Sequence, residues 1–103
     1  MPRTELLWTL MALAALRDIR AQIAEQTGPR SAQRYLQRIK AAARGLKRFP
    51  QRGWVVAEFQ DPTILEIVVG SHRIIYRYRD NKVTIMNVFH GARILRREHL
   101  ESD

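Results

Sequence analysis

The feature that most constrains the fold is a change in hydrophobic period at Trp54. Before this residue, apolar side chains recur at helical spacing in two segments, and after it they alternate as in strands. Helices followed by hairpins are typical of an α+β layer with the helices on one side of the sheet. At 103 residues the chain suits one domain, residues 1–103, with its own core. We therefore expect an α+β fold in which two N-terminal helices pack on one face of a twisted antiparallel sheet.

The segment before Trp54 contains recognisable helix boundaries. A short first strand is expected at Glu5–Trp8, and Thr9 then offers a side-chain cap for the first helix. Gly28-Pro29 ends that helix, because glycine suits the residue after a helix and proline cannot continue one. A second helix begins at this proline or just after it and continues to Pro50. The predicted buried stripes are Ala12, Leu16, Ile19 and Ile23, and then Ala32, Leu36, Ile39, Ala43 and Leu46.

Four strands are expected after the helices, at Trp54–Phe59, Ile64–Val69, His72–Arg79 and Lys82–His90. The loops Gly70-Ser71 and Asp80-Asn81 are short enough to set the register of the hairpins. In that register Arg73 lies opposite Val88 and close to His90. A short helix or tail is expected at Ile94–Leu100.

Alternation along these strands sorts the side chains onto two faces. The face expected to pack on the helices holds Leu65, Ile67, Val69, Ile74, Tyr76, Tyr78, Val83, Ile85 and Phe89. The other face holds Ile64, Glu66, Val68, Arg73, Ile75, Arg77, Thr84, Met86, Val88 and His90. We call the second face the open face. It combines an apolar floor with two arginines, a carboxylate and a histidine, so it is either a binding face or a surface with an ion-pair ladder.

The positive charge is concentrated in one segment of the chain. The formal net charge is +8, yet no acidic residue occurs between Glu25 and Glu58. The bases in that gap are Arg30, Arg34, Arg38, Lys40, Arg44, Lys47, Arg48 and Arg52. Such a field favours a polyanion or an acidic protein segment, although a solvated helix face remains an alternative. We expect Arg34, Arg38 and Lys40 to contact a partner.

The composition argues against a metal site and against secretion. The chain has no cysteine and only three scattered histidines, so neither a disulfide framework nor a metal or other cofactor is expected. The apolar pattern near the N-terminus continues at helical spacing past Leu16, as in an amphipathic helix rather than a signal peptide. No stretch is long enough to span a bilayer. We expect a cytoplasmic protein that does not bind membranes.

Several motifs follow one another along the chain in a recognisable order. The run from Ile67 to Arg77, IVVGSHRIIYR, resembles the hairpin "vvgsyRiiYr" of the RelE/ParE superfamily of bacterial toxins. The run from Val83 to Arg93 resembles their closing strand and "HgaR" tail, and Leu46–Pro50 resembles "l..fP". An early "W…A..DL..I" pattern is echoed by Trp8, Ala14, Leu16 and Ile19. The resemblance covers nearly the whole chain and implies a toxin of a type II toxin–antitoxin system that arrests growth and contributes to plasmid stabilisation.

The superfamily contains two activities. RelE-type members cleave mRNA on the translating ribosome, which requires cations at the phosphate and a proton acceptor. If this chain is such a nuclease, the resemblance implies that its catalytic residues are Arg73, His90, Arg93 and His99. However, the strand that carries paired lysines in the nucleases has Ile64 and Glu66 here.

ParE-type members instead inhibit DNA gyrase, and the closing "HgaR" run fits this group better. We therefore expect a gyrase inhibitor that is not an enzyme, with mRNA cleavage as the alternative and a non-catalytic nucleic-acid-binding module as a third reading. The expected partner is an antitoxin, in a hetero-oligomer. Besides the three bases of the second helix, the expected binding residues are Glu66, Arg73, Arg77, Met86, His90, Arg93, Arg96 and Arg97.

Overall fold

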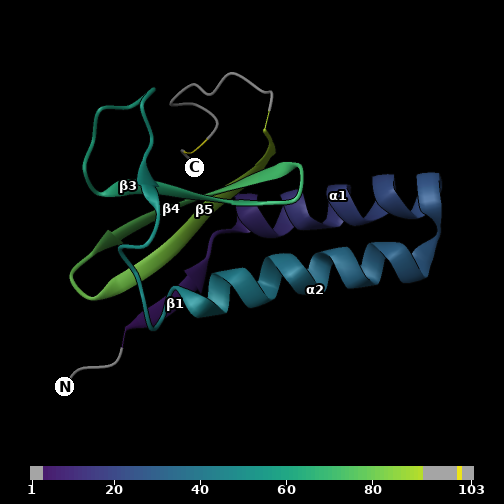
Figure 1. Ribbon diagram of the computed structural model, residues 1–103, viewed down its shortest axis with the longest axis horizontal. Helices are drawn as coiled ribbons and strands as arrows, with labels where there is room; N and C mark the ends of the chain where they lie inside the picture. The colour runs from purple at the N-terminus through teal and green to yellow at the C-terminus, as the bar shows by residue number, and fades with distance from the viewer. Residues whose placement is uncertain (1–3, 92–99, 101–103) are drawn as a thin grey trace.

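The computed structural model describes residues 4–91 and Leu100. Its elements are β1 (Glu5–Trp8), α1 (Leu10–Thr27), α2 (Pro29–Gly45), β2 (Trp54–Val55), β3 (Ile64–Val69), β4 (His72–Arg79) and β5 (Lys82–His90). The two helices form an antiparallel pair that lies along one side of the sheet (Figure 1). The predicted α+β class, with both helices on one face, is confirmed. Neither described helix is long and apolar enough to cross a membrane.

The helices begin and end where their boundary residues predict. The hydroxyl of Thr9 accepts a hydrogen bond from the Ala12 backbone N–H, which caps α1. Gly28 has a φ of 98°, a left-handed conformation that suits glycine, and it separates the two helices in a single residue. The helix α2 ends at Gly45, earlier than the predicted Pro50, and turns connect it to the sheet. The predicted apolar stripes face the sheet and form the main core.

The sheet has five strands in the order β1-β5-β4-β3-β2. Strands β2 to β5 are antiparallel, as predicted, and β1 adds a parallel pairing to β5 that the sequence pattern did not indicate. This pairing covers only the first half of β5, from Lys82 to Ile85. The chain then leaves the sheet at Thr9, whose N–H bonds to the Ile85 carbonyl, and enters α1. On the side where β1 ends, the second half of β5 has α1 beside it, while its other edge stays paired with β4.

A β-bulge in β5 makes part of the predicted register wrong. Arg77 pairs with Thr84 as predicted, but Ile75 pairs with Asn87 and Arg73 pairs with Phe89. One additional residue in β5 shifts every later side chain to the opposite face. Val88 accordingly packs in the core under the helices, and Phe89 packs on the open face. Both had been predicted on the other side.

The open face carries a second, smaller apolar core. Its buried members are Val56, Phe59, Ile64, Ile75, Phe89 and Leu100, with Met86 packed against them. The strand predicted at Trp54–Phe59 ends at Val55, because the chain turns after it and folds back across the sheet. These turns bring Val56 and Phe59 onto the open face. That face is therefore covered in part by the chain's own residues.

Candidate functional site

Arg73 is the centre of a charged cluster on the open face. Its guanidinium donates from Nη1 and Nη2 to the two oxygens of Glu58, at 3.2 Å each. It also donates from Nε to Glu66 Oε2 at 3.1 Å, and Nη2 forms a second, shorter bond to the same oxygen. The side chain is only 12% exposed. Burial opposes the charge, but the hydrogen bonds of Glu58 and Glu66 outweigh it, so the pKa of Arg73 is raised.

Glu58 belongs to the segment that folds over the open face. The bond to Arg73 therefore joins that segment to β3 and β4 across the sheet. An ion pair between Arg73 and Glu66 is the ladder that the sequence predicts as the alternative to a binding face. The contact between Arg73 and Glu58 is not predicted from the sequence. Arg77 lies further along the same face, 3.8 Å from Asp61, and its Nε is buried with no hydrogen-bond partner among the described residues. The guanidinium of Arg73, which a bound phosphate would need, is therefore already paired with the carboxylates of Glu58 and Glu66.

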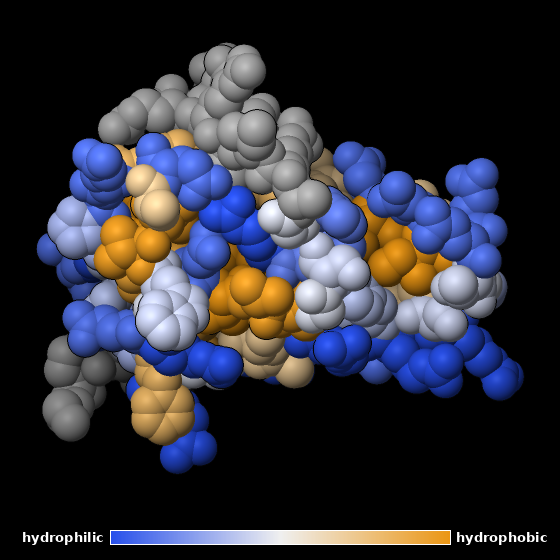
Figure 2. Space-filling view, turned by 45° about the horizontal axis from the view of Figure 1, so that its top comes forward, coloured by the Kyte–Doolittle hydropathy of each residue, from blue (hydrophilic) through white to orange (hydrophobic). Residues whose placement is uncertain are grey.

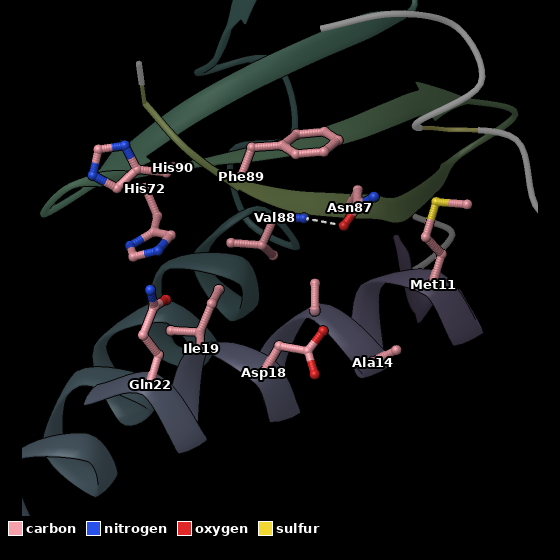
Figure 3. A pocket seen from close by; sticks show the side chains of 11 residues that line it. Met11, Ala14, Asp18, Ile19, Gln22, His72, Asn87, Val88, Phe89 and His90 are labelled. Carbon is pink, nitrogen blue, oxygen red and sulfur yellow. Dashed lines mark hydrogen bonds between the residues drawn. The ribbon is translucent and has the colours of Figure 1, made fainter. Parts of the chain in front are cut away.

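His90 lies on the face opposite to Arg73, so the predicted arrangement of these two residues is wrong. The bulge pairs His90 with His72, whose neighbour in β3 is Val69. The two imidazoles are 5.7 Å apart between ring centroids. Both line a groove of about 460 Å³ between α1 and the second half of β5 (Figure 3). This groove and the charged cluster of Arg73 therefore lie on opposite faces of the sheet.

Polar side chains from both elements line the groove, and none of its described lining residues is lysine or arginine. Asp18 and Gln22 project from α1 toward β5, and His72 and His90 project from the sheet (Figure 3). Asn87 closes one end, where its side chain accepts a hydrogen bond from the Val88 N–H. Phosphate chemistry needs cations beside the reacting group, and the described residues of this groove do not supply them. Its mixture of acceptors, donors and apolar side chains suits a protein segment instead.

His72 is held by Tyr35, a contact that the sequence did not reveal. The Tyr35 hydroxyl oxygen is 2.5 Å from His72 Nδ1 and accepts the Ser71 N–H at 3.1 Å. The same hydroxyl donates to the Val69 carbonyl at 3.1 Å. Burial, and then the charge of neighbouring His90, lower the pKa of His72. The imidazole is therefore neutral near pH 7 and joins α2 to the β3–β4 turn.

A second groove runs between the two helices. It has a volume of about 340 Å³ and is lined by Leu13, Leu16, Arg17, Arg20, Leu36 and Lys40. Leucines form its floor and the basic side chains its rim, and no acidic residue is among its described lining residues. Lys40 was predicted as a binding residue, whereas Arg17 and Arg20 were missed because they lie on the other helix. Arg34 and Arg38 are exposed on α2 outside this groove.

The other predicted site residues fall into two groups. Met86 is half-buried against the open-face core, and it also lines a hollow with Arg77 near the β4–β5 turn. Arg93, Arg96, Arg97 and His99 lie outside the described residues, as does the helix predicted before Leu100. Within the described part of the chain, no three His, Cys, Asp or Glu side chains are grouped to hold a metal ion.

Two solved structures have the same arrangement of helices and strands. One is a chain of the chromosomal ParDE toxin–antitoxin system from P. aeruginosa, with a TM-score of 0.73, 19% identity, and coverage of 85% of this chain and 96% of that one. The other belongs to the toxin–antitoxin complex RelBE2 from Mycobacterium tuberculosis, with a TM-score of 0.62, 21% identity and coverage of 86% and 99%. This chain therefore shares the fold of those two chains.

The sequence comparisons identify the family. The model described as "ParE toxin of type II toxin-antitoxin system, parDE" matches residues 6–95. Toxin RelE2 from Caulobacter vibrioides is 37% identical over 91 residues, which cover 87% of this chain and 98% of that toxin. The chain belongs to the ParE toxin family of type II toxin–antitoxin systems, as the sequence motifs predicted.

Proposed function

We propose that this toxin arrests growth by inhibiting DNA gyrase and that it does not cleave mRNA. The observation that carries the proposal is the separation of Arg73 from His90 by the sheet. A nuclease would bring a phosphate-binding cation and a proton acceptor to the same phosphodiester. Here Arg73 bonds Glu58 and Glu66 on one face, and His90 lies on the other, in a groove whose described lining residues include no lysine or arginine.

The charge on the open face supports the same proposal. A phosphate that approached Arg73 would displace or face two carboxylates, and repulsion at such short range opposes binding. The names of the related proteins do not decide between gyrase inhibition and mRNA cleavage, since one is a RelE toxin and another belongs to a ParDE system. In this proposal the target is contacted by the tail bases Arg93, Arg96 and Arg97.

The test replaces those three tail arginines by glutamine. Truncation after Gly91 would be less informative, because it removes Leu100 from the open-face core. We expect the parent protein to inhibit gyrase supercoiling and to accumulate cleaved gyrase–DNA complexes. The triple variant should need about tenfold more protein for the same inhibition, because each lost cation weakens a charged contact.

The control variant carries the same loss of charge on α2, as Arg34→Gln, Arg38→Gln and Lys40→Gln, and should inhibit gyrase as the parent does. Circular dichroism should show equal folding for all three proteins. Codon-specific mRNA cleavage on purified translating ribosomes, abolished by His90→Ala or Arg93→Ala, would replace the proposal with the nuclease alternative.

We further propose that the partner is an antitoxin with an acidic, amphipathic segment that binds the groove between α1 and α2. The leucine floor would receive apolar side chains, and Arg17, Arg20 and Lys40 would pair with carboxylates. Both structural relatives come from toxin–antitoxin systems, which supports a partner of this kind. The exposed bases Arg34 and Arg38 would extend the positive field that attracts the segment.

Charge reversal in this groove should slow antitoxin association. For Arg20→Glu with Lys40→Glu we expect about a tenfold lower association rate at low salt and a smaller difference at high salt, because screening weakens long-range attraction. The matched control is Arg79→Glu with Lys82→Glu, at the exposed turn of the β4–β5 hairpin. Stopped-flow mixing with the antitoxin measures the association rate of each double variant at low and at high salt. Equal slowing by the two double variants would contradict a specific role for the groove.

A further inference from the structure

The loop between α2 and the sheet exposes two aromatic side chains among basic residues. We define the basic–aromatic loop as residues 47–54, KRFPQRGW. Phe49 is 63% exposed and Trp54 is 77% exposed. Large aromatic side chains normally bury most of their area, so two that stay exposed on one short loop indicate a surface for a ligand.

The loop is held in place, which distinguishes it from a mobile connection. The hydroxyl of buried Tyr76 accepts the Gly53 N–H at 3.0 Å and donates to the Pro50 carbonyl at 2.8 Å. Within the loop, the Arg52 N–H bonds to the Phe49 carbonyl at 3.2 Å. Trp54 then enters β2, opposite Glu66 in β3. The backbone is thus fixed before any ligand arrives, which reduces the entropy lost on binding.

Every charged side chain within the basic–aromatic loop is basic. Arg48 lies over the Phe49 ring, 5.9 Å from its centroid, and Arg48 and Arg52 both line a hollow of about 550 Å³ with Phe49. No acidic residue occurs from position 26 to position 57. Glu66, opposite Trp54, bonds to Arg73. Figure 2 shows hydrophilic side chains in blue beside hydrophobic ones in orange at the left-hand end of the molecule.

We infer that the basic–aromatic loop binds single-stranded nucleic acid. Exposed bases would stack on Phe49 and Trp54, and Arg48 and Arg52 would contact the phosphates between them. Aromatic stacking beside a cationic track is how proteins hold single strands without reading their sequence. An acidic protein segment would satisfy the arginines but would not supply flat rings for both aromatic side chains. This binding uses neither Arg73 nor the helix groove, so it does not depend on the proposed target or partner.

The test measures fluorescence anisotropy of a labelled single-stranded DNA 12-mer of mixed sequence, with the matching RNA and a duplex as further probes. We expect Phe49→Ala and Trp54→Ala each to weaken single-strand binding about tenfold, because stacking contributes that much per base. Leu10→Ala is the control, since Leu10 is 80% exposed on α1. It should leave binding unchanged, and thermal melting should confirm that every variant is folded.

The phosphate contacts have their own readout. Arg48→Gln and Arg52→Gln should each reduce the slope of log affinity against log salt by about 0.7, the value for one phosphate on a single strand. Arg30→Gln, the same change in the first turn of α2, should leave the slope as it is. If the loop variants and the control variants bind alike, or if the aromatic variants weaken duplex binding as much as single-strand binding, the inference is wrong.

Trp54 itself reports the stacking. The chain has two tryptophans, so Trp8→Phe leaves Trp54 as the only indole. We expect its fluorescence to be quenched in proportion to the bound single strand. Unchanged Trp54 fluorescence at saturating single strand would overturn the inference. A double variant, Phe49→Ala with Trp54→Ala, that fails to bind antitoxin yet binds the single strand normally would overturn it as well. The last result would assign the loop to a protein partner.

Discussion

Gly53→Ala is expected to destabilise the toxin by about 3 kcal/mol, although it adds a single methyl group. A Cβ at this position would lie 2.5 Å from the Tyr76 hydroxyl oxygen and 2.7 Å from the Glu66 carbonyl oxygen. The carbonyl belongs to β3, and the tyrosine is fully buried, so neither can move away freely. The added methyl would also break the two hydrogen bonds that the hydroxyl makes to the Gly53 N–H and the Pro50 carbonyl.

Gly45→Ala provides the matched control. Gly45 is the last residue of α2, and its added Cβ would meet only the Arg52 guanidinium at 4.0 Å. Alanine is the better helix former, so this variant should gain about 0.5 kcal/mol. Urea unfolding followed by circular dichroism measures both free energies. For a domain of this size the Gly53 variant should also melt about 12 °C lower or more. A Gly53→Ala protein as stable as the parent would show that Tyr76 does not hold the loop.

The helices and most strands could be predicted because local patterns determine them. Thr9, Gly28 and Pro29 have the side chains that start or end helices, and the apolar stripes identify the faces that turn inward. The bounds of β3, β4 and β5 are those predicted, since two tight turns separate them. The parallel pairing of β1 joins segments almost eighty residues apart, and no local pattern carries that information.

The candidate site was harder to predict, because one bulge decides which residues meet. Alternation without the bulge places Arg73 beside His90, whereas the additional residue at Met86–Asn87 moves His90 to the helix face. The register through the β3–β4 turn did predict that Glu66 lies diagonal to Arg73. Glu58 reaches the same guanidinium only because its segment folds over the sheet. Its contact depends on tertiary structure that strand periodicity does not describe.

Arg73→Met is expected to cost about 3 kcal/mol of unfolding free energy, because it leaves two carboxylates side by side without their cation. Glu58 and Glu66 are only 31% and 19% exposed, so water compensates them poorly. Arg77→Met is the matched control. The Arg77 side chain is 29% exposed, and its Nη2 is as far as 3.8 Å from Asp61 Oδ2, so this change should cost less than about 1 kcal/mol. Chemical denaturation at pH 7 compares the two variants with the parent.

The decisive variant combines Arg73→Met with Glu58→Gln and Glu66→Gln. Removing both negative charges should restore at least half of the lost stability, because neutral amides beside an apolar side chain do not repel each other. Arg73→Met should also weaken growth arrest, because an unstable toxin is less abundant as folded protein. If Arg73 acts only by holding the segment of Glu58 on the sheet, the restabilised triple variant should arrest growth as the parent does when it is expressed without antitoxin. A triple variant that is stable but harmless would instead place Arg73 in contact with the target. A triple variant no more stable than Arg73→Met would show that the arginine stabilises the open face by its packing, since charge repulsion would then explain none of the loss.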